Sequence, residues 1–471
     1  MKPLSALDAL FLHLESPETP MHVGALHLLA PPPGNGRTYV AAVRRHLAGR
    51  LHLSPVFTRR LVTMPLALAN PVWVHADGVD LHAQVRLSVL PPPGTPAQLY
   101  ATVARLHARP LDRDRPLWCL HVIEGLASGE LALYTRVHHA TLDGAASVAF
   151  AHALLDTTPE PRTVPPPERR VPDEPPGVTA LLRTAVGTTL TQARRALGQL
   201  PEAGRVLAAL AARAAARPGD GPGGAALRFA PRTPLNTTIG RARTIGTLSV
   251  ALHEVVRVAD RHDATVNEVV LAMVSGALRR YLGARGSLPG PPMIAAVPVS
   301  LREAGNAEAT TLATMSRMGL ATDIDDPIAR LHAIRIGSGR TKSLAKALRS
   351  VIPTDLPSIG MPWWLGGAAA LYGRARLAER LPPLANLVVS NFPGPPTPMY
   401  LAGARLITWW PLSIVEHGLG LNVTVQSYAG SLEFGVVAAR EAIRDAGEFV
   451  AAMREAFAEL RSLRAASRRV R

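Results

Sequence analysis

The sequence predicts an α/β protein of two domains joined by a helical connector. Short apolar runs typical of strands alternate with helix-like segments in both halves of the chain, as in residues 131–155 and 255–297. The 471 residues are too many for one ordinary core, and two domains of about 200 residues each are the natural division. A proline-rich, charged stretch at 159–176 is a poor core former and marks the boundary. We therefore expect domains at residues 1–158 and 231–471, with the boundary and connector at 159–230.

Composition limits the classes of partner and compartment. The 51 lysines and arginines against 35 aspartates and glutamates give a formal net charge of +16. This charge fits either a solvated basic surface or a cationic face for anionic lipid or phosphate groups. Only 4% of residues are aromatic, and the basic segments contain no stacking motif, so we expect no nucleic acid partner. The single cysteine, Cys119, fits a reducing compartment, and its apolar neighbours predict a buried, inert thiol.

The first domain is expected to begin with a helix. Residues 4–14 place apolar side chains at helical spacing, and Ser5 or Asp8 would cap the first turn. Asp8 also interrupts the apolar run after Lys2, so we predict no signal peptide here. The elements expected next are a strand at 22–29, a helix at 37–51, strands at 57–62 and 71–75, a helix at 96–108 and a hairpin of strands at 118–123 and 131–137.

Two histidines follow the second strand of that hairpin, and they are the candidate chemical groups of the chain. His138 and His139 stand at the strand end, and Asp143 and Gly144 lead into a helix over 145–155. A neutral imidazole can take a proton from a hydroxyl, so His139 is the natural general base. Asp143 could hold that imidazole, or it could pair with an arginine and lock the turn. A structural pair of histidines capping a strand is the alternative, but the combination with Asp-Gly favours catalysis.

The connector is rich in arginine and small apolar residues. Residues 178–217 carry leucines and alanines at near-helical spacing and six arginines against the single acid Glu202, and Pro201 is expected to divide them into two helices. Two interpretations stay open: a connector that packs on both domains, or an amphipathic cationic surface that lies on a membrane or oil droplet. A flexible linker at 218–224 should follow.

The second domain should contain helices at 255–263 and 266–282, strands at 293–297 and 385–389, a hairpin at 422–435 and a closing helix at 440–463. Trp363 and Trp364 lie beside a glycine/alanine run with basic neighbours, which suits either a lipid interface or a buried helix pair. The apolar window 356–373 contains two prolines and four glycines, so we do not predict a membrane-spanning helix.

A family resemblance follows from these residues. The pattern His138-His139-x-x-x-Asp143-Gly144 marks the CoA-dependent acyltransferase superfamily, and the rest of the chain resembles the bacterial wax ester synthase/diacylglycerol acyltransferases. The blocks that carry this resemblance are 20–24, 111–118, 267–272, 298–302, 390–395 and 422–435. Gln84, Glu268 and Phe392 depart from the family pattern, which puts substrate choice in doubt more than activity.

The resemblance implies two chloramphenicol acetyltransferase-like domains that face each other across a channel reaching His139 from both sides. It implies that His138 orients the turn and that Arg302 pairs with Asp143 across the interface. Asn267 would cap a helix and face the acyl channel, and Ser390 and Asn391 are candidates for stabilising the oxyanion. Acyl-CoA would be a substrate, and neither a metal nor a bound cofactor is expected.

The expected function is an O-acyltransferase that moves a fatty acyl group from acyl-CoA to diacylglycerol or a long-chain alcohol, making triacylglycerol or wax ester. We expect it in the cytoplasm, peripherally bound at the inner membrane face or on lipid droplets. An alternative is a condensation-like acyltransferase that acylates a polar small molecule. A non-catalytic lipid-droplet protein is a third hypothesis, which the complete histidine motif disfavours.

Overall fold

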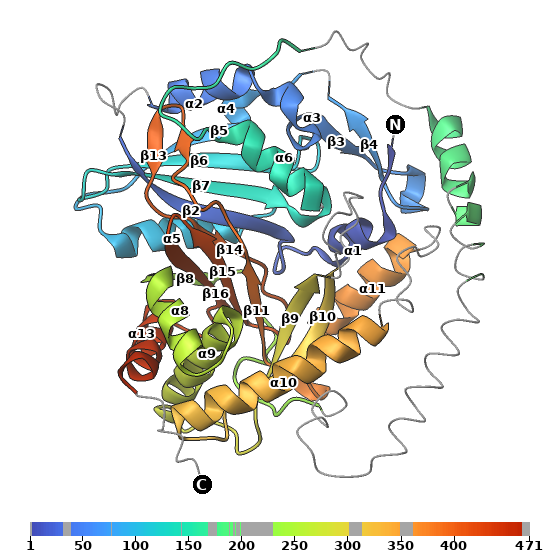
Figure 1. Ribbon diagram of the computed structural model, residues 1–471. Helices are drawn as coiled ribbons and strands as arrows, with labels where there is room; N and C mark the ends of the chain where they lie inside the picture. The colour runs from blue at the N-terminus through green and yellow to red at the C-terminus, as the bar shows by residue number, and fades with distance from the viewer. Residues whose placement is uncertain are drawn as a thin grey trace.

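The computed structural model describes residues 2–31, 39–76, 78–142, 144–167, 177–187, 229–300, 313–348 and 361–463, and the positions 189–191, 194 and 198. Two large sheets carry this part of the chain, and helices cover their outer faces (Figure 1). A small third sheet contains β1 (Lys2–Pro3), β3 (Arg59–Val62) and β4 (Val72–His75). The predicted α/β class with two sheet-based halves is confirmed.

The N-terminal sheet has seven strands, with the path β12-β13-β2-β7-β6-β5 and with β14 also paired to β2. Its strands are β2 (His22–Ala30), β5 (Val85–Val89), β6 (Trp118–Glu124), β7 (Leu131–His138), β12 (Tyr400–Leu401), β13 (Ala404–Leu406) and β14 (Trp410–Leu412). The predicted hairpin is confirmed, since β6 and β7 pair antiparallel from Trp118 opposite Val137 to Ile123 opposite Ala132.

Apolar side chains on one face of this sheet pack against helices. Alternate residues of β6 and β7, such as Leu120 and Leu133, share a core with residues of three helices because neighbouring residues of a strand point to opposite faces. Those helices are α2 (Tyr39–Ala48), α3 (Pro55–Thr58) and α6 (Gly144–Leu154). The predicted helix after the histidine turn therefore exists and lies on its own sheet.

Residues 400–412 cross from the C-terminal half to the N-terminal sheet. β14 pairs with β2, and Tyr400 forms a bridge with Asp156 beyond the end of α6. Asp156 and Arg50 are only 2% and 3% exposed, and Arg50 Nη1 lies 2.9 Å from Asp156 Oδ1. The linear division at residues 158 and 231 does not anticipate this exchange of strands, so the two halves interlock.

The C-terminal sheet has six strands in the order β10-β9-β11-β15-β16-β8. They are β8 (Arg243–Ala251), β9 (Ile294–Ser300), β10 (Ala313–Gly319), β11 (Leu387–Phe392), β15 (Leu421–Tyr428) and β16 (Ser431–Ala439). The helices α8 (Leu252–Arg261), α9 (Val266–Gly283), α10 (Pro327–Leu348) and α13 (Ala446–Ser462) belong to this half. The predicted 422–435 hairpin and closing helix are confirmed, whereas β8, β10 and α10 were not predicted.

The two halves approach closely at β14. A Cβ atom on Gly435 would lie 1.6 Å from the carbonyl oxygen of Pro411, so only glycine allows β14 to lie against β16. Tyr100 of α5 (Pro96–His107) adds a contact, because its hydroxyl lies 2.8 Å from Thr247 Oγ1 of β8. The outer face of the C-terminal sheet therefore packs on α9 and α13, and its inner face meets the N-terminal half.

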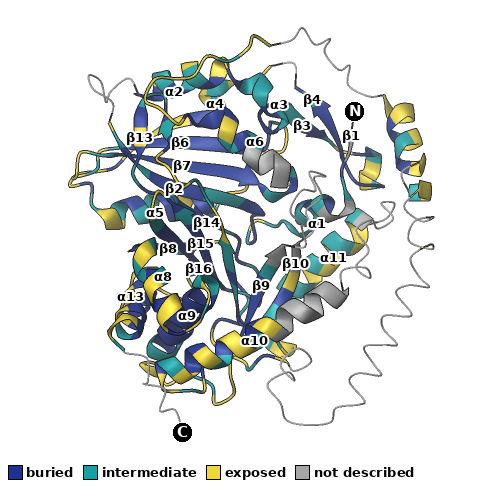
Figure 2. Ribbon diagram, viewed as in Figure 1, coloured by how far each residue is buried: buried dark blue, intermediate teal, exposed yellow. Residues whose placement is uncertain are grey.

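Most of the connector lies outside the described residues. The helical segment 177–187 packs Leu181 and Ala185 onto the small sheet, while Val178 and Val186 are exposed (Figure 2). One side of this segment therefore packs on the first domain, and contact of the connector with a membrane or oil droplet stays a prediction. Among the described residues, no helix combines the length and apolarity needed to cross a membrane.

Candidate active site

A short 3₁₀ turn, η4 (His139–Thr141), holds the histidine pair directly after β7. The His138 N–H donates to the carbonyl oxygen of Leu117 at 2.9 Å, and the His139 N–H donates to that of Met21 at 2.9 Å. The turn is therefore fixed to the strands on both sides of β7. A rigid backbone at this point restricts where the two imidazoles can point.

The imidazole of His139 stacks on the ring of Phe11 in α1 (Ala6–Leu14), with ring centroids 3.9 Å apart and planes at 19°. Its Nδ1 is buried without a hydrogen-bond partner among the described residues. Burial and the neighbouring His138 lower the pKa of His139 to about 4. The ring is therefore neutral at neutral pH, which is the form that accepts a proton.

His138 is fully buried, and a hydrogen bond at Nδ1 holds its ring. Its Nδ1 accepts a hydrogen bond from the Ala140 N–H at 3.1 Å, so a neutral ring carries its proton on Nε2. That Nε2 lies 3.4 Å from Glu15 Oε1. This geometry fits the orienting role predicted for His138 and leaves proton transfer from the substrate to His139.

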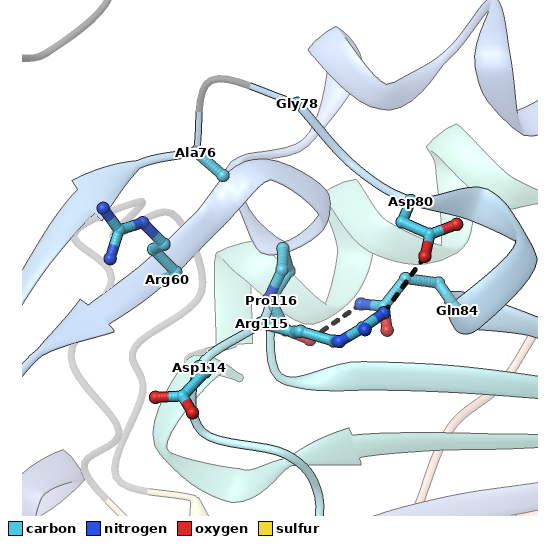
Figure 3. A pocket seen from close by; sticks show the side chains of 8 residues that line it. All are labelled: Arg60, Ala76, Gly78, Asp80, Gln84, Asp114, Arg115 and Pro116. Atoms are coloured by element: carbon cyan, nitrogen blue, oxygen red, sulfur yellow. Dashed lines mark hydrogen bonds and ion pairs between the residues drawn. The ribbon is translucent and has the colours of Figure 1, made fainter.

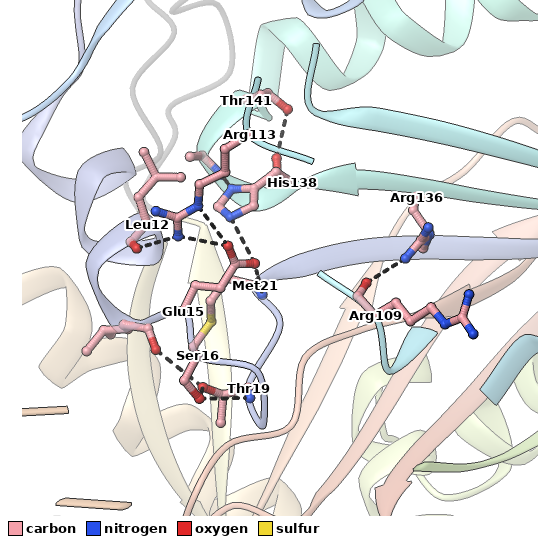
Figure 4. A network of polar contacts seen from close by, with 12 residues as sticks. Leu12, Glu15, Ser16, Thr19, Met21, Arg109, Arg113, Arg136, His138 and Thr141 are labelled. Atoms are coloured by element: carbon pink, nitrogen blue, oxygen red, sulfur yellow. Dashed lines mark hydrogen bonds and ion pairs between the residues drawn. The ribbon is translucent and has the colours of Figure 1, made fainter. Parts of the chain in front are cut away.

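Glu15 and Arg113 complete a polar network that sequence analysis missed (Figure 4). Arg113 Nη2 donates to Glu15 Oε2 at 2.8 Å, and the Met21 N–H donates to Glu15 Oε1 at 3.0 Å. Burial alone would raise the pKa of Glu15, but the hydrogen bonds from His138, Met21 and Arg113 outweigh it and lower that pKa to about 2. Glu15 is therefore a carboxylate that faces His138.

The block 111–118 leads into β6 and is held by a buried tryptophan and by ion pairs. Trp118 is 1% exposed, and its indole N–H donates to the carbonyl oxygen of Phe57 at 3.1 Å. Arg115 forms ion pairs at 3.2 Å with Asp80 and with Asp112. These contacts give the block a structural role at the turn before β6.

A pocket of about 260 Å³ lies beside this turn (Figure 3). Gln84, which departs from the family pattern, lines it and donates to the carbonyl oxygen of Pro116 at 2.8 Å. The other lining residues are Arg60, Ala76, Gly78, Asp80, Asp114, Arg115 and Pro116. None of them belongs to the histidine turn, so this pocket is separate from the candidate catalytic group.

Asn267, Ser390 and Asn391 do not form one cluster. Asn391 Nδ2 lies 3.4 Å from Asn267 Oδ1, so Asn391 points toward α9. Ser390 is adjacent in β11 and points to the opposite face. It pairs with Thr424, which pairs with Gly435, the glycine that lies against β14. Of the two oxyanion candidates, Ser390 is therefore the one on the inner face between the halves.

The expected cap of α9 is wrong. Thr265 is the N-cap, and it exchanges hydrogen bonds with Glu268 as a capping box, with Thr265 N–H to Glu268 Oε2 at 2.8 Å. Glu268 therefore has a structural role at a position where it departs from the family.

Asp143 and Arg302 lie outside the described residues, so their pairing stays a prediction, and Gly144 begins α6. Within the described ranges, no three His, Cys, Asp or Glu side chains gather as metal ligands would.

Known proteins of similar sequence define the family. A model of the wax ester synthase/diacylglycerol acyltransferase catalytic domain matches residues 4–270, and one of the WS/DGAT C-terminal domain matches residues 312–461. A putative diacylglycerol O-acyltransferase of Mycobacterium tuberculosis is 36% identical over 448 residues, which cover 93% of this chain and 95% of the relative. A probable diacylglycerol O-acyltransferase of the same species is 35% identical over 445 residues, 93% of each chain.

Solved structures agree in fold. The first condensation domain of the CDA synthetase matches with a TM-score of 0.58 at 16% identity, covering 100% of this chain and 98% of that one, which shows the fold alone. The wax ester synthase/diacylglycerol acyltransferase from Marinobacter aquaeolei VT8 matches with a TM-score of 0.68 at 30% identity, covering 98% of both chains. The chain thus shares its fold with condensation domains, and it belongs to the wax ester synthase/diacylglycerol acyltransferase family.

Proposed function

We propose that this protein transfers a fatty acyl group from acyl-CoA to the hydroxyl of diacylglycerol or a long-chain alcohol, giving triacylglycerol or wax ester. Family membership and the names of its mycobacterial relatives support this activity. The observation that carries it is the neutral His139, fixed in the turn and packed against Phe11. The condensation-like neighbours share the fold, which by itself does not favour a polar acceptor.

The reaction needs one proton shuttle. His139 accepts the hydroxyl proton while the oxygen forms a bond to the thioester carbonyl carbon. The tetrahedral intermediate then expels the CoA thiolate, which takes the proton from His139, and the ester is released. No covalent enzyme intermediate forms, and His139 returns to its neutral state.

Other groups would hold this geometry. His138 and Glu15 position the turn, and Ser390 or a backbone N–H stabilises the oxyanion. Asp143 pairs with Arg302 and fixes the entry to α6, as an arginine–carboxylate fork can do. A double-mutant cycle on activity tests that pair: coupled losses support it, and additive losses mean that the two side chains do not interact.

The direct test of the function is thiol release from palmitoyl-CoA with a panel of acceptors: a long-chain alcohol, diacylglycerol, an amine and water. Release that depends on the alcohol or diacylglycerol, with the ester identified by mass spectrometry, supports the proposal. Release that depends only on the amine would favour the polar-acceptor alternative, and no release with any acceptor would overturn enzymatic function.

The acceptors partition into lipid, so the enzyme would work peripherally at the cytoplasmic membrane face or on a lipid droplet. The arginines of residues 178–217 support electrostatic attraction to anionic lipid, which salt screens. Binding to anionic vesicles should weaken as salt rises and when Arg194, Arg195 and Arg205 become glutamine. Binding that resists both salt and alkaline carbonate would contradict a peripheral mode.

A further inference from the structure

Large apolar side chains are exposed on three neighbouring segments of the structure. They are the turn η3 (Pro65–Ala67), the helical segment 177–187 and α11 (Met361–Arg374). Leu66 is 82% exposed and Trp364 is 79% exposed, so the alternative of a buried tryptophan helix pair is wrong. We call the exposed set the apolar face: Leu66, Val178, Leu182, Val186, Trp363, Trp364 and Leu371.

Contacts between the segments make this one continuous face. The indole N–H of Trp363 donates to the carbonyl oxygen of Leu66 at 3.1 Å, which joins α11 to η3. Leu181 and Ala185 pack with Met64 and Ala69, which flank η3, so the segment 177–187 lies on its other side. Figure 1 shows the three segments along the same side of the molecule, and Figure 2 shows exposed residues along the segment 177–187 and at η3.

The residue spacing directs the apolar side chains outward together. Val178, Leu182 and Val186 recur every four residues, and Trp364 and Leu371 are seven apart, so each set forms one stripe of its helix. Leu66 has a φ of 54° and Ala67 a φ of 50°, a left-handed conformation that costs free energy in residues other than glycine. The chain accepts this strain where it presents a leucine to the outside.

The charge of the face is one-sided. Residues 65–67, 177–187 and 361–374 contain no aspartate or glutamate, and their only charged side chains are Arg183 and Arg374, both exposed. Soluble surfaces mix acidic and basic groups, and an apolar patch without carboxylates marks an interaction site. Tryptophan with arginine is the combination that lipid interfaces favour.

We propose that the apolar face docks the enzyme on a lipid surface with anionic head groups and thereby brings the lipid-dissolved acceptor next to His139. This inference rests on the proposed function for its acceptor, and it names the surface that the function would need. In the docked state, the side chains of Trp364 and Leu66 insert below the lipid head groups. Arg183 and Arg374 then contact the lipid phosphates.

The position of the catalytic turn supports this choice of occupant. α1 contacts both α11 and η4, and a Cβ on Gly366 of α11 would lie only 3.8 Å from the carbonyl oxygen of His13. Phe11 of α1 stacks on His139, and His13 Nε2 lies 2.9 Å from Asn70 Oδ1, just beyond η3. One helix thus joins the apolar face to the candidate base. A protein partner would gain nothing from that proximity, whereas a lipid acceptor would.

Tryptophan quenching tests the docking with the full-length protein. Of the six tryptophans, Trp363 and Trp364 are the pair with large exposed fractions, so vesicles of phosphatidylcholine and phosphatidylglycerol with brominated chains should quench mainly these two. Quenching should appear in the wild type and be lost in the Trp363→Phe/Trp364→Phe variant. Absent quenching, or equal quenching in that variant by residues elsewhere, would overturn the proposal.

Vesicle binding gives the second measurement. The Leu66→Ser/Trp364→Ser variant should bind these vesicles more weakly by on the order of tenfold for each side chain removed. Val89→Ser is the matched control, because Val89 is 67% exposed on the edge strand β5, far from the apolar face in Figure 1. It should bind like the wild type. Unchanged binding in the double variant would contradict docking through this face.

Two further readouts separate the explanations. With a short, water-soluble alcohol, the double variant should keep wild-type thiol release, and with a vesicle-borne acceptor it should lose it. If the wild type releases no thiol with any acceptor, the proposed function fails, while vesicle binding still decides the docking. If vesicles do not bind and the double variant abolishes a dimer seen by size-exclusion chromatography, the face is a contact between copies of this chain.

Discussion

The imidazole of His139 is the group that moves the proton in the proposed reaction. Replacing it with alanine should reduce acyl transfer by about 10²- to 10⁴-fold or more, the range that general-base catalysis supplies. His138→Ala should retain more activity, because His138 orients the turn through Ala140 and Glu15 and does not meet the substrate.

Thiol release from palmitoyl-CoA measures both variants, with circular dichroism and thermal unfolding as checks that each one folds. Equal activity in wild type and His139→Ala would refute the mechanism. A greater loss in His138→Ala would reverse the roles of the two histidines.

Glu15 should act on the rate and leave substrate binding unchanged. Glu15→Gln removes the negative charge that faces His138, and hydrogen bonds to charged groups contribute about 1.5–3 kcal/mol. If the interaction between Glu15 and His138 stabilises the transition state and not the bound substrate, kcat falls about tenfold to hundredfold while KM stays unchanged.

Glu18→Gln is the matched control, since Glu18 lies three residues away in a partly exposed pair with Arg241 and should keep full activity. A change in KM alone for Glu15→Gln would show that Glu15 acts in substrate binding and does not position His138.

The histidine pair could be predicted from the sequence, but the residues that hold it, Glu15 and Arg113, could not. His138, His139 and the turn are contiguous, so strand, turn and helix patterns locate them together. Glu15 and Arg113 are separated by 98 positions, and they meet because α1 folds against the turn before β6. The signal available was the Asp/Arg-rich block 111–118, which predicts ion pairs but not their partners.

The strands that interlock the two halves are too short for a periodic pattern. β12, β13 and β14 have two or three residues each, and period-2 alternation cannot be recognised over so few positions. The buried pair of Arg50 and Asp156 instead fixes the crossing segment, because Asp156 also bridges to Tyr400.

Asp156→Asn should therefore destabilise the protein by roughly 3–5 kcal/mol, since it leaves the buried Arg50 guanidinium without its counter-ion. Urea unfolding followed by tryptophan fluorescence measures the loss. Asp112→Asn removes an ion pair that is more than half exposed on the aspartate side and should change stability by less than about 1 kcal/mol. Equal losses in the two variants would mean that burial of the pair is unimportant.

At the scale of the whole molecule, the two-sheet α/β architecture followed from length, the proline-rich boundary and alternating apolar runs. The burial of polar residues did not follow, because a histidine in a strand looks the same whether it faces solvent or a second layer. In the structure, histidines fill the face of the N-terminal sheet opposite α6. His22 and His121 are at most 4% exposed. His107 also belongs to this layer, and its Nδ1 lies 2.6 Å from the hydroxyl of Tyr134.

The buried histidines of the N-terminal half, in this layer and outside it, should make stability depend on acid. Burial lowers the pKa of His27 and His139 to about 4 and of His107 and His121 to about 3, and it lowers the pKa of His22 well below its usual value. In the unfolded chain, the histidine pKa values are near 6.5. Between about pH 4 and 6.5, the unfolded state therefore binds more protons than the native state. The contribution of these histidines to the free energy of unfolding is therefore complete above about pH 6.5, and it falls as the pH drops toward 4.

One carboxyl opposes this trend. Burial raises the pKa of Glu433 to about 7, so its contribution to stability is present below its ordinary pKa and is lost as pH rises through 7. Five lowered histidines outweigh one raised carboxyl between pH 4.5 and 6.5. The net slope of stability with pH is positive over that interval.

Urea unfolding at a series of pH values measures that slope. His121→Gln removes one of the buried titrating groups and should make the slope shallower by about one proton, or about 1.4 kcal/mol per pH unit at most. His253→Gln, at an exposed position, should leave it unchanged. Because His22 of β2 pairs directly with His138 of β7, activity and stability should be lost together on acidification. A stability flat from pH 4.5 to 6.5, or an equal effect of the two variants, would show that the layer takes up protons without unfolding.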